Sequence, residues 1–210
     1  MLPLLVKMRL TTMAMAGFSA ASSPAPLPIA SITVGFAERA ATPVDVVLYD
    51  ENLHVHANVV IDHQGNSDIV TTMQIRQLFH CRKSQKQHVI ARKTLMMLAD
   101  VQEMYEGKTI EFVSVYRGNR EESATSPHRD GRAIDFRIRG VQLREIRDYL
   151  WRKYTEVGVG WYPSEQFIHM DTRPTWHDTS WTFLHGVNHY DPVWAAQVRT
   201  PATTSSQARR

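Results

Sequence analysis

The sequence predicts an α+β domain with a mainly antiparallel sheet flanked by helices. Two runs rich in Val, Ile and Leu, 46–49 and 53–61, are separated by turn residues at 50–52, which is typical of a β-hairpin spanning 46–61. After this hairpin, strand-like and helix-like segments do not alternate in the β–α–β order of a parallel sheet. No internal repeat is present. We therefore expect a single domain over about residues 43–198.

The remaining elements follow from the spacing of apolar residues. Apolar side chains recur at helical spacing in three segments: 70–80, 89–105 and 142–154. Runs rich in β-branched and aromatic residues predict strands over three others: 109–116, 157–161 and 166–170. Residues 62–66 have turn composition, and so do residues 162–165, which include Pro163.

Composition excludes several classes of protein. Of 210 residues, 43% are hydrophobic and 21% charged, which is globular rather than disordered composition. The net charge of +3 is too weak to indicate a nucleic-acid partner. No apolar stretch reaches the roughly 18 residues of a membrane-spanning helix, so we expect no integral membrane segment. We expect a monomer.

The two ends differ from the middle of the chain. Residues 1–42 form a leader in which Lys7 and Arg9 precede a short run of small and apolar residues. Two interpretations stay open: a secretion signal, which would make the protein periplasmic or secreted, or a disordered leader, which would leave a cytoplasmic location open. Residues 199–210 are rich in Ser and Thr, and we expect a disordered tail.

Any metal site must use His, Asp or Glu, because the chain has only one cysteine, Cys81, and ten histidines. His54 and His56 alternate with apolar residues in the predicted hairpin, so they share a face. That pair is either a metal pair or the solvated side of the hairpin.

A second set of residues is more specific. Residues 126–135 read SPHRDGRAID, in which Gly131 indicates a turn between His128 and the strand that carries Asp135. His169 lies on a later predicted strand. Imidazole and carboxylate are ordinary zinc ligands, and three protein ligands leave a fourth position open, as in catalytic zinc sites. Without further evidence, His128 could equally be a surface histidine and Asp135 could be paired with a neighbouring arginine. His169 could equally be a buried core histidine.

Three stretches resemble a known family. SPHRDGRAIDF is similar to the S-x-H-x-x-G-x-A-x-D signature of zinc D-Ala-D-Ala carboxypeptidases and murein endopeptidases, which share the Hedgehog/DD-peptidase fold. FVSVYRG resembles the upstream strand that ends in a tyrosine–arginine pair. VGVGWYPSEQFIHMDTR resembles the G-x-G-x-Y-P…F-x-H-x-D-x-R segment of the MepK-like branch. The resemblance covers about residues 70–178, and its pieces occur in the family's order.

The resemblance implies a zinc peptidase. It implies a zinc cleft on the sheet, with His128, Asp135 and His169 as Zn²⁺ ligands. The substrate would be peptidoglycan or a muropeptide, cut in its stem peptides or cross-links, with endopeptidase activity favoured over carboxypeptidase activity. Arg117 would stabilise an oxyanion or hold a substrate carboxylate, although a structural ion pair is an equal alternative. Asp171 would orient a ligand.

One departure from the family leaves the general base unassigned. Many relatives carry an acidic residue three positions before the last histidine, where this chain has Gln166. Asp171 and Glu165 are the candidate bases. The same departure keeps a rival hypothesis open, namely a zinc-containing binding module of this fold that has lost catalysis.

Aromatic residues are concentrated in the segment 179–198, which follows the predicted site, and Trp176 lies just before that segment. They either wall a substrate groove or pack over the core. The aromatic residues are Trp176, Trp181, Phe183, Tyr190 and Trp194. Three histidines of the same segment could stabilise an oxyanion: His177, His185 and His189.

Overall fold

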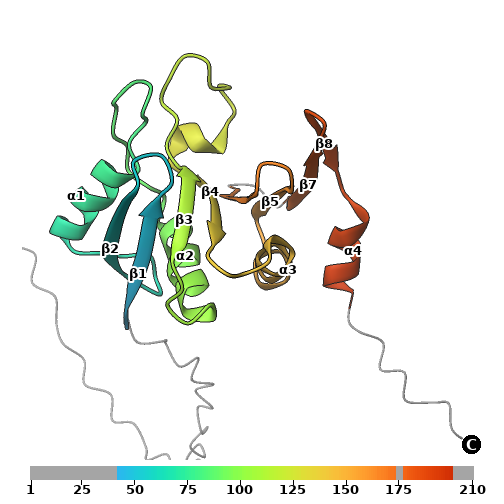
Figure 1. Cartoon of the computed structure of the whole chain (residues 1–210), viewed down its shortest axis with the longest axis horizontal. Coiled ribbons are helices and arrows are strands. Elements are labelled where there is room, and N and C mark those ends of the chain that lie inside the picture. The colour runs from blue at the N-terminus through green and yellow to red at the C-terminus, as the bar shows by residue number, and fades with distance from the viewer. Residues whose placement is uncertain (1–41, 174–176, 201–210) are drawn as a thin grey trace, which may run out of the picture. The chain divides into compact units, whose positions relative to one another are not determined.

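The computed structural model describes residues 42–173 and 177–200 (Figure 1). The expected leader, 1–42, lies outside these residues except for Thr42, and the expected tail, 199–210, does so except for Arg199 and Thr200. The strands are β1 (Pro43–Asp50), β2 (Val55–Asp62), β3 (Ile110–Ser114), β4 (Ala133–Ile138), β5 (Val157–Tyr162), β6 (Phe167–Thr172), β7 (Thr179–Leu184) and β8 (Val187–Tyr190). The helices are α1 (Ile69–Leu78), α2 (Arg92–Met104), α3 (Leu143–Lys153), α4 (Val193–Arg199) and the 3₁₀ helix η1 (Pro127–Asp130).

The strands form one mixed sheet in the order β2-β1-β3-β4-β6-β5-β7-β8. Neighbours are antiparallel except for the pairs β1–β3 and β5–β7, which are parallel. The α+β class predicted from the sequence is confirmed. The parallel pairs were not predicted, because they join strands that are distant in the chain.

The predicted N-terminal hairpin is present, but its second strand begins later than expected. β1 and β2 pair antiparallel from Pro43↔Asp62 to Asp50↔Val55. His54 lies in the turn with a φ of 56°, so the prediction that His54 and His56 alternate along one strand is wrong. The carboxylate of Asp50 accepts hydrogen bonds from the backbone N–H groups of Asn52 and Leu53. The chain therefore turns for two residues longer than the hydrophobic run indicates, because β2 begins at Val55.

α2 begins at Arg92, three residues later than its periodicity predicts. The preceding residue, Ala91, is extended, and its N–H donates to the carbonyl of Gly131 at 2.9 Å. A Cβ on Gly131 would lie 2.4 Å from the carbonyl oxygen of Val89, and the φ of Gly131 is 63°. Both facts require glycine in this turn. The turn is thus held against the segment that leads into α2.

The sheet has an apolar face and a polar face around β4 and β6. Ile134, Phe136, Ile168 and Met170 belong to the hydrophobic core, which also contains residues of α2 and α3. Because successive side chains of a strand point to opposite faces, the residues between them face away from these helices. Asp135 and His169 are therefore on the face opposite the core. Among residues 42–173 and 177–200, no helix is long and apolar enough to cross a membrane.

The aromatic segment forms the hairpin β7–β8 followed by α4. Trp194 packs edge-on against Trp151 of α3, and its indole N–H donates to Thr182 of β7. This part of the segment covers the core, as one of the two alternatives predicted. Trp181 instead lies beside His169, with ring centroids 5.1 Å apart.

Candidate metal centre

Three elements position the predicted ligands. His128 lies on η1, which ends at Gly131 in the left-handed conformation and leads directly into β4. Asp135 of β4 and His169 of β6 are directly opposite in the antiparallel register. Opposed residues of an antiparallel pair have neighbouring side chains, so the register alone brings this aspartate and histidine together.

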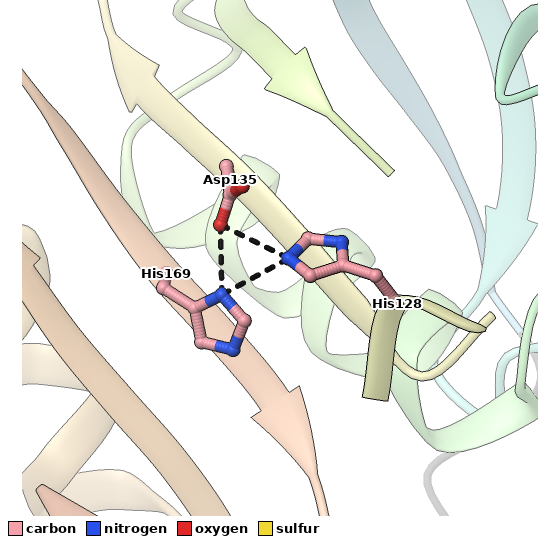
Figure 2. Close-up of side chains that lie close together, drawn as sticks. All are labelled: His128, Asp135 and His169. Carbon is pink, nitrogen blue, oxygen red and sulfur yellow. Dashed lines mark hydrogen bonds and ion pairs between the residues drawn. The ribbon is translucent and has the colours of Figure 1, made fainter. Parts of the chain in front are cut away.

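The three side chains converge on one point (Figure 2). His169 Nδ1 lies 2.7 Å from Asp135 Oδ1, and His128 Nε2 lies 3.2 Å from His169 Nδ1. His128 Nε2 is 3.3 Å from the same Asp135 oxygen. All three residues are buried, and one donor atom from each lies within 4.8 Å of the others. The predicted convergence of His128, Asp135 and His169 is therefore present.

The outward nitrogen of each histidine has a partner of its own. His128 Nδ1 lies 2.5 Å from the carbonyl oxygen of Val115, which only accepts hydrogen bonds, so Nδ1 carries the proton. His169 Nε2 lies 3.1 Å from a carboxylate oxygen of Asp171 and donates to it. In the neutral tautomers these contacts favour, two imidazole lone pairs and a carboxylate oxygen face one another. Such a set suits a cation bound between its members, and two histidines with a carboxylate are ordinary zinc ligands.

The pKa values of His169 and Asp135 are both shifted by their neighbours. Burial opposes charge on His169, but its hydrogen bonds to Asp135 and Asp171 raise the pKa of His169 to about 9. Burial likewise opposes charge on Asp135, yet the neighbouring His128 and His169 hold the pKa of this carboxyl well below its usual value. The surroundings of His169 and Asp135 therefore favour positive charge where the three donor atoms meet.

Arg117 reaches the same aspartate from outside. Its Nη2 donates to Asp135 Oδ2, and its Nε donates to the hydroxyl of Ser114 at 2.8 Å. Its remaining terminal nitrogen, Nη1, lies 3.8 Å from Glu122 Oε2. The side chain is 35% exposed and lines the cavity at the site. Arg117 therefore agrees with both predicted alternatives: it forms an ion pair with Asp135, and it also lines the cavity.

Asp171 lies behind His169. It is fully buried, and the Nη2 of Arg173 donates to its Oδ2 at 2.9 Å. Although burial would raise it, the contacts with His169 and Arg173 keep the pKa of Asp171 below its usual value. A Cβ on Gly158 would lie 2.1 Å from Asp171 Oδ2, so the first glycine of the VGVG segment leaves room for this pair. Asp171 is placed to hold the ring of His169.

The turn between β5 and β6 points away from the site. Glu165 is exposed and is not among the residues that line the cavity, so it does not reach the position of a base. Gln166 is also exposed, with a φ of 60°, and its amide donates to the carbonyl of Pro163. It lines a separate surface hollow near Trp161. The chain position from which many relatives supply an acid is therefore outside this cavity.

A cavity of about 530 Å³ opens over the three ligands. Trp181 forms part of its wall, and a Cβ on Gly160 would lie 2.4 Å from the indole ring. The indole N–H donates to the hydroxyl of Tyr162 at 3.1 Å, and Tyr190 also lines the cavity. The other interpretation of the aromatic segment, a groove wall, is thus also correct for these residues. Tyr162 and Arg173, which occupy positions of the family pattern, also line the cavity. Lining residues that the sequence did not single out are Glu122, Ser123, Thr125, Thr179 and Asn188.

Several other histidines lie away from the cavity. His177, His185 and His189 are exposed and do not line it, so none is placed to stabilise an oxyanion there. His54 Nδ1 is 3.0 Å from the hydroxyl of Tyr49, and no candidate metal cluster among the described residues contains His54 or His56. Trp176 lies outside the described residues.

Two comparisons with known proteins place the chain in a family. The family model described as peptidoglycan L,D-endopeptidase MepK matches residues 38–177. A probable peptidoglycan L,D-endopeptidase MepK of Haemophilus influenzae is 44% identical over 62 residues, which is 29% of this chain and 33% of the relative. The peptidoglycan L,D-endopeptidase MepK of Escherichia coli K12 is 34% identical over 80 residues, 33% of this chain and 43% of the relative. The chain therefore covers less than half the length of these curated relatives.

No solved structure matches this chain. The family model covers most of the chain, including all three converging residues and the elements that carry them. The chain belongs to the peptidoglycan L,D-endopeptidase MepK family.

Proposed function

We propose that this chain is a zinc peptidase that hydrolyses amide bonds in peptidoglycan stem peptides or their cross-links, with endopeptidase rather than carboxypeptidase action. The observation that carries the proposal is the convergence of His128 Nε2, Asp135 Oδ1 and His169 Nδ1, with no proton donor between them in their favoured tautomers. The names of the family and of its relatives supply the substrate class.

His128, Asp135 and His169 would hold the ion, on the polar face of a Hedgehog/DD-peptidase-like sheet. When bound, zinc would polarise the scissile carbonyl and lower the pKa of water towards neutrality. Residues around the ion would orient its ligands. Val115 and Asp171 orient the two imidazoles through their outward nitrogens.

Arg117 is the cation that lies at the edge of the cavity. Its guanidinium is held by Ser114 and Asp135 but stays 35% exposed, so it can donate to a substrate oxygen without leaving the site. A planar, permanently charged group in this place stabilises the negative charge that develops on the carbonyl oxygen during hydrolysis. Trp181 and Tyr190 supply an apolar wall for the substrate.

The proposal extends to the compartment and to the domain boundaries. A peptidoglycan substrate places the enzyme in the periplasm or outside the cell, and the N-terminal leader, 1–42, would then be a secretion signal. The peptidase domain would span 43–198 and act as a monomer, without a nucleic-acid partner.

The test is digestion of purified cross-linked muropeptides by the zinc-loaded full chain, with products identified by mass. An endopeptidase converts each dimer into two smaller muropeptides with the gain of one water, whereas a carboxypeptidase releases one terminal amino acid. A chelator should abolish the reaction and added zinc should restore it. Zinc binding without turnover of any muropeptide would instead favour the binding-module hypothesis.

A further inference from the structure

The general base can be sought among the carboxylates that line the cavity. Among the described residues there are three: Glu122, Asp135 and Asp171. Asp135 faces the two imidazoles with one oxygen and Arg117 with the other. Asp171 is fully buried and engaged by His169 and Arg173. A base must accept a proton from the attacking water, so it needs an accessible lone pair. Neither aspartate offers one.

Glu122 differs from both aspartates. Its side chain is 17% exposed, and its nearest charged partner in the described structure is Arg117 Nη1, at 3.8 Å. That distance is too long for a hydrogen bond, so both oxygens of Glu122 keep free lone pairs. The neighbouring nitrogen of the same guanidinium contacts Asp135. Glu122 and the ligand Asp135 are therefore separated by one guanidinium group.

The loop that carries Glu122 is anchored by the ligand motif itself. Arg129, the residue after His128, donates from Nη1 to the carbonyl oxygens of Glu122 at 2.8 Å and Asn119 at 3.3 Å. The backbone N–H of Arg117 donates to the carbonyl of His128 at 3.2 Å. The segment that supplies a metal ligand thus also fixes the backbone at Glu122 beside the cavity.

We propose that Glu122 is the general base of the hydrolysis; this inference rests on the proposed function. Its carboxylate takes one proton from water as the water oxygen forms a bond to the amide carbon, and returns that proton to the amide nitrogen as the C–N bond breaks. The second water proton also ends on the leaving nitrogen, so the products are a carboxylate and an ammonium group. No other reactant is needed.

The adjacent residue provides a matched control. Glu121 is paired with Lys83, and its side chain is 76% exposed. It lines a neighbouring hollow of about 370 Å³, which Glu122 also lines, but it does not line the cavity at the three converging residues. Glu121→Gln and Glu122→Gln remove the same charge from neighbouring positions of one loop. Only the second removes a carboxylate from the cavity above the ligands.

The experiment compares wild type, Glu121→Gln and Glu122→Gln on cross-linked muropeptides. We expect Glu122→Gln to lower kcat by about 10²–10⁴-fold with little change in KM, while Glu121→Gln keeps wild-type kcat. Zinc content, measured by elemental analysis, and muropeptide binding by the metal-free proteins, measured by calorimetry, should be the same in all three. Glu122→Asp, which keeps a shorter carboxylate, should recover part of the lost kcat.

The other possible outcomes distinguish a wrong role for Glu122 from a wrong proposed function. Wild-type kcat in Glu122→Gln would overturn the role of Glu122 and leave the proposed function standing. Lost zinc or weakened muropeptide binding in Glu122→Gln would show that Glu122 only supports Arg117 and the ligands, which also overturns its role as base. Absence of turnover by the wild type would overturn the proposed function and this inference together.

Discussion

Two clusters of histidine and carboxylate in this protein have similar composition and different chemistry. In the first, His128, Asp135 and His169 bring three lone-pair atoms to one point, and all three residues are buried. In the second, His63, Asp100 and Glu103 also place one donor atom each within 4.8 Å of the others. Residue type and proximity alone would make both of them metal sites.

The second cluster supplies its own positive charge. His63 turns Nδ1 to Asp100 at 3.1 Å and Nε2 to Glu103 at 3.4 Å, so its two nitrogens serve different carboxylates. The ammonium of Lys153 lies 2.8 Å from Asp100, and the hydroxyl of Tyr154 donates to the same carboxylate at 2.7 Å. This cation and this donor satisfy Asp100 from within the chain. In the first cluster, Arg117 contacts only Oδ2 of Asp135 and leaves Oδ1 to the two imidazoles.

The two clusters differ in the number of histidines and in the partner of His128. In the first cluster the carbonyl of Val115 takes the proton-bearing nitrogen of His128, so the Nε2 lone pair of His128 faces Asp135 and His169. The second cluster has one histidine, and both nitrogens of His63 face carboxylates. A candidate metal site is therefore distinguished by the partners behind its histidines as much as by the residue types it contains.

The largest expected effect comes from removing a ligand of the first cluster. Asp135→Ala should lose zinc and all measurable turnover, whereas Asp100→Ala should retain zinc binding. At zinc about 100-fold above its dissociation constant, the ion should add about 2.7 kcal/mol to the unfolding free energy of the wild type and nothing to that of Asp135→Ala. Thermal unfolding with and without zinc measures this. Equal stabilisation of both proteins by zinc would place the metal elsewhere.

The next effect concerns Arg117, the cation beside the first cluster. Arg117→Lys keeps a positive charge but loses the planar group that joins Ser114 and Asp135. Loss of one oxyanion donor typically costs about 10²–10³ in kcat, and we expect a loss of that size at unchanged zinc content. Steady-state kinetics and metal analysis check it. Wild-type kinetics in the lysine variant would make Arg117 a structural arginine.

A smaller effect is expected behind His169. Asp171→Asn removes the acceptor that holds Nε2, and such partners typically contribute about 10–100-fold. We expect kcat to fall within that range at matched zinc occupancy. Glu165→Gln, outside the cavity, is the control and should keep wild-type kcat. A loss above roughly 10³-fold in either variant would identify that carboxylate as the base instead.

The smallest effect on activity comes from the second cluster, where we expect a change in stability. Although burial would raise it, contacts with Lys153, Tyr154 and His63 keep the pKa of Asp100 below its usual value. Asp100→Asn should lower the unfolding free energy by about 1–3 kcal/mol near neutral pH and leave zinc content and kcat unchanged.

The pH dependence of that change has a definite sign. A carboxyl whose folded pKa is lowered contributes stability above its unfolded pKa of about 3.9 and loses it as the pH falls through the folded value. The stability difference between wild type and Asp100→Asn should therefore shrink in acid. Denaturant unfolding at a series of pH values measures it, and a difference that grows in acid would contradict the assigned contacts.

Local sequence was sufficient wherever the relevant neighbours are close in the chain. The glycine turn between His128 and Asp135 follows from ten consecutive residues, and strand alternation puts His169 and Asp171 on one face. The segment expected to be helical, 89–105, ends within one residue of the end of α2 at Met104, whereas its start differs by three residues. The start depends on a contact with Gly131, which lies 40 residues later in the sequence.

The sequence by itself determined the α+β class and the order of the main helices and strands up to β6, because hydrophobic periodicity encodes them. The set of three converging residues followed from the resemblance of two separate segments to a known family. Only the tertiary structure decided the parallel pairs β1–β3 and β5–β7, the outward position of Glu165 and Gln166, and the presence of Glu122 at the cavity. These depend on which distant segments meet, and on a single backbone angle at Gln166 that turns its side chain outward. Neither spacing nor residue type carries that information, since the energy that selects it comes from packing across the whole domain.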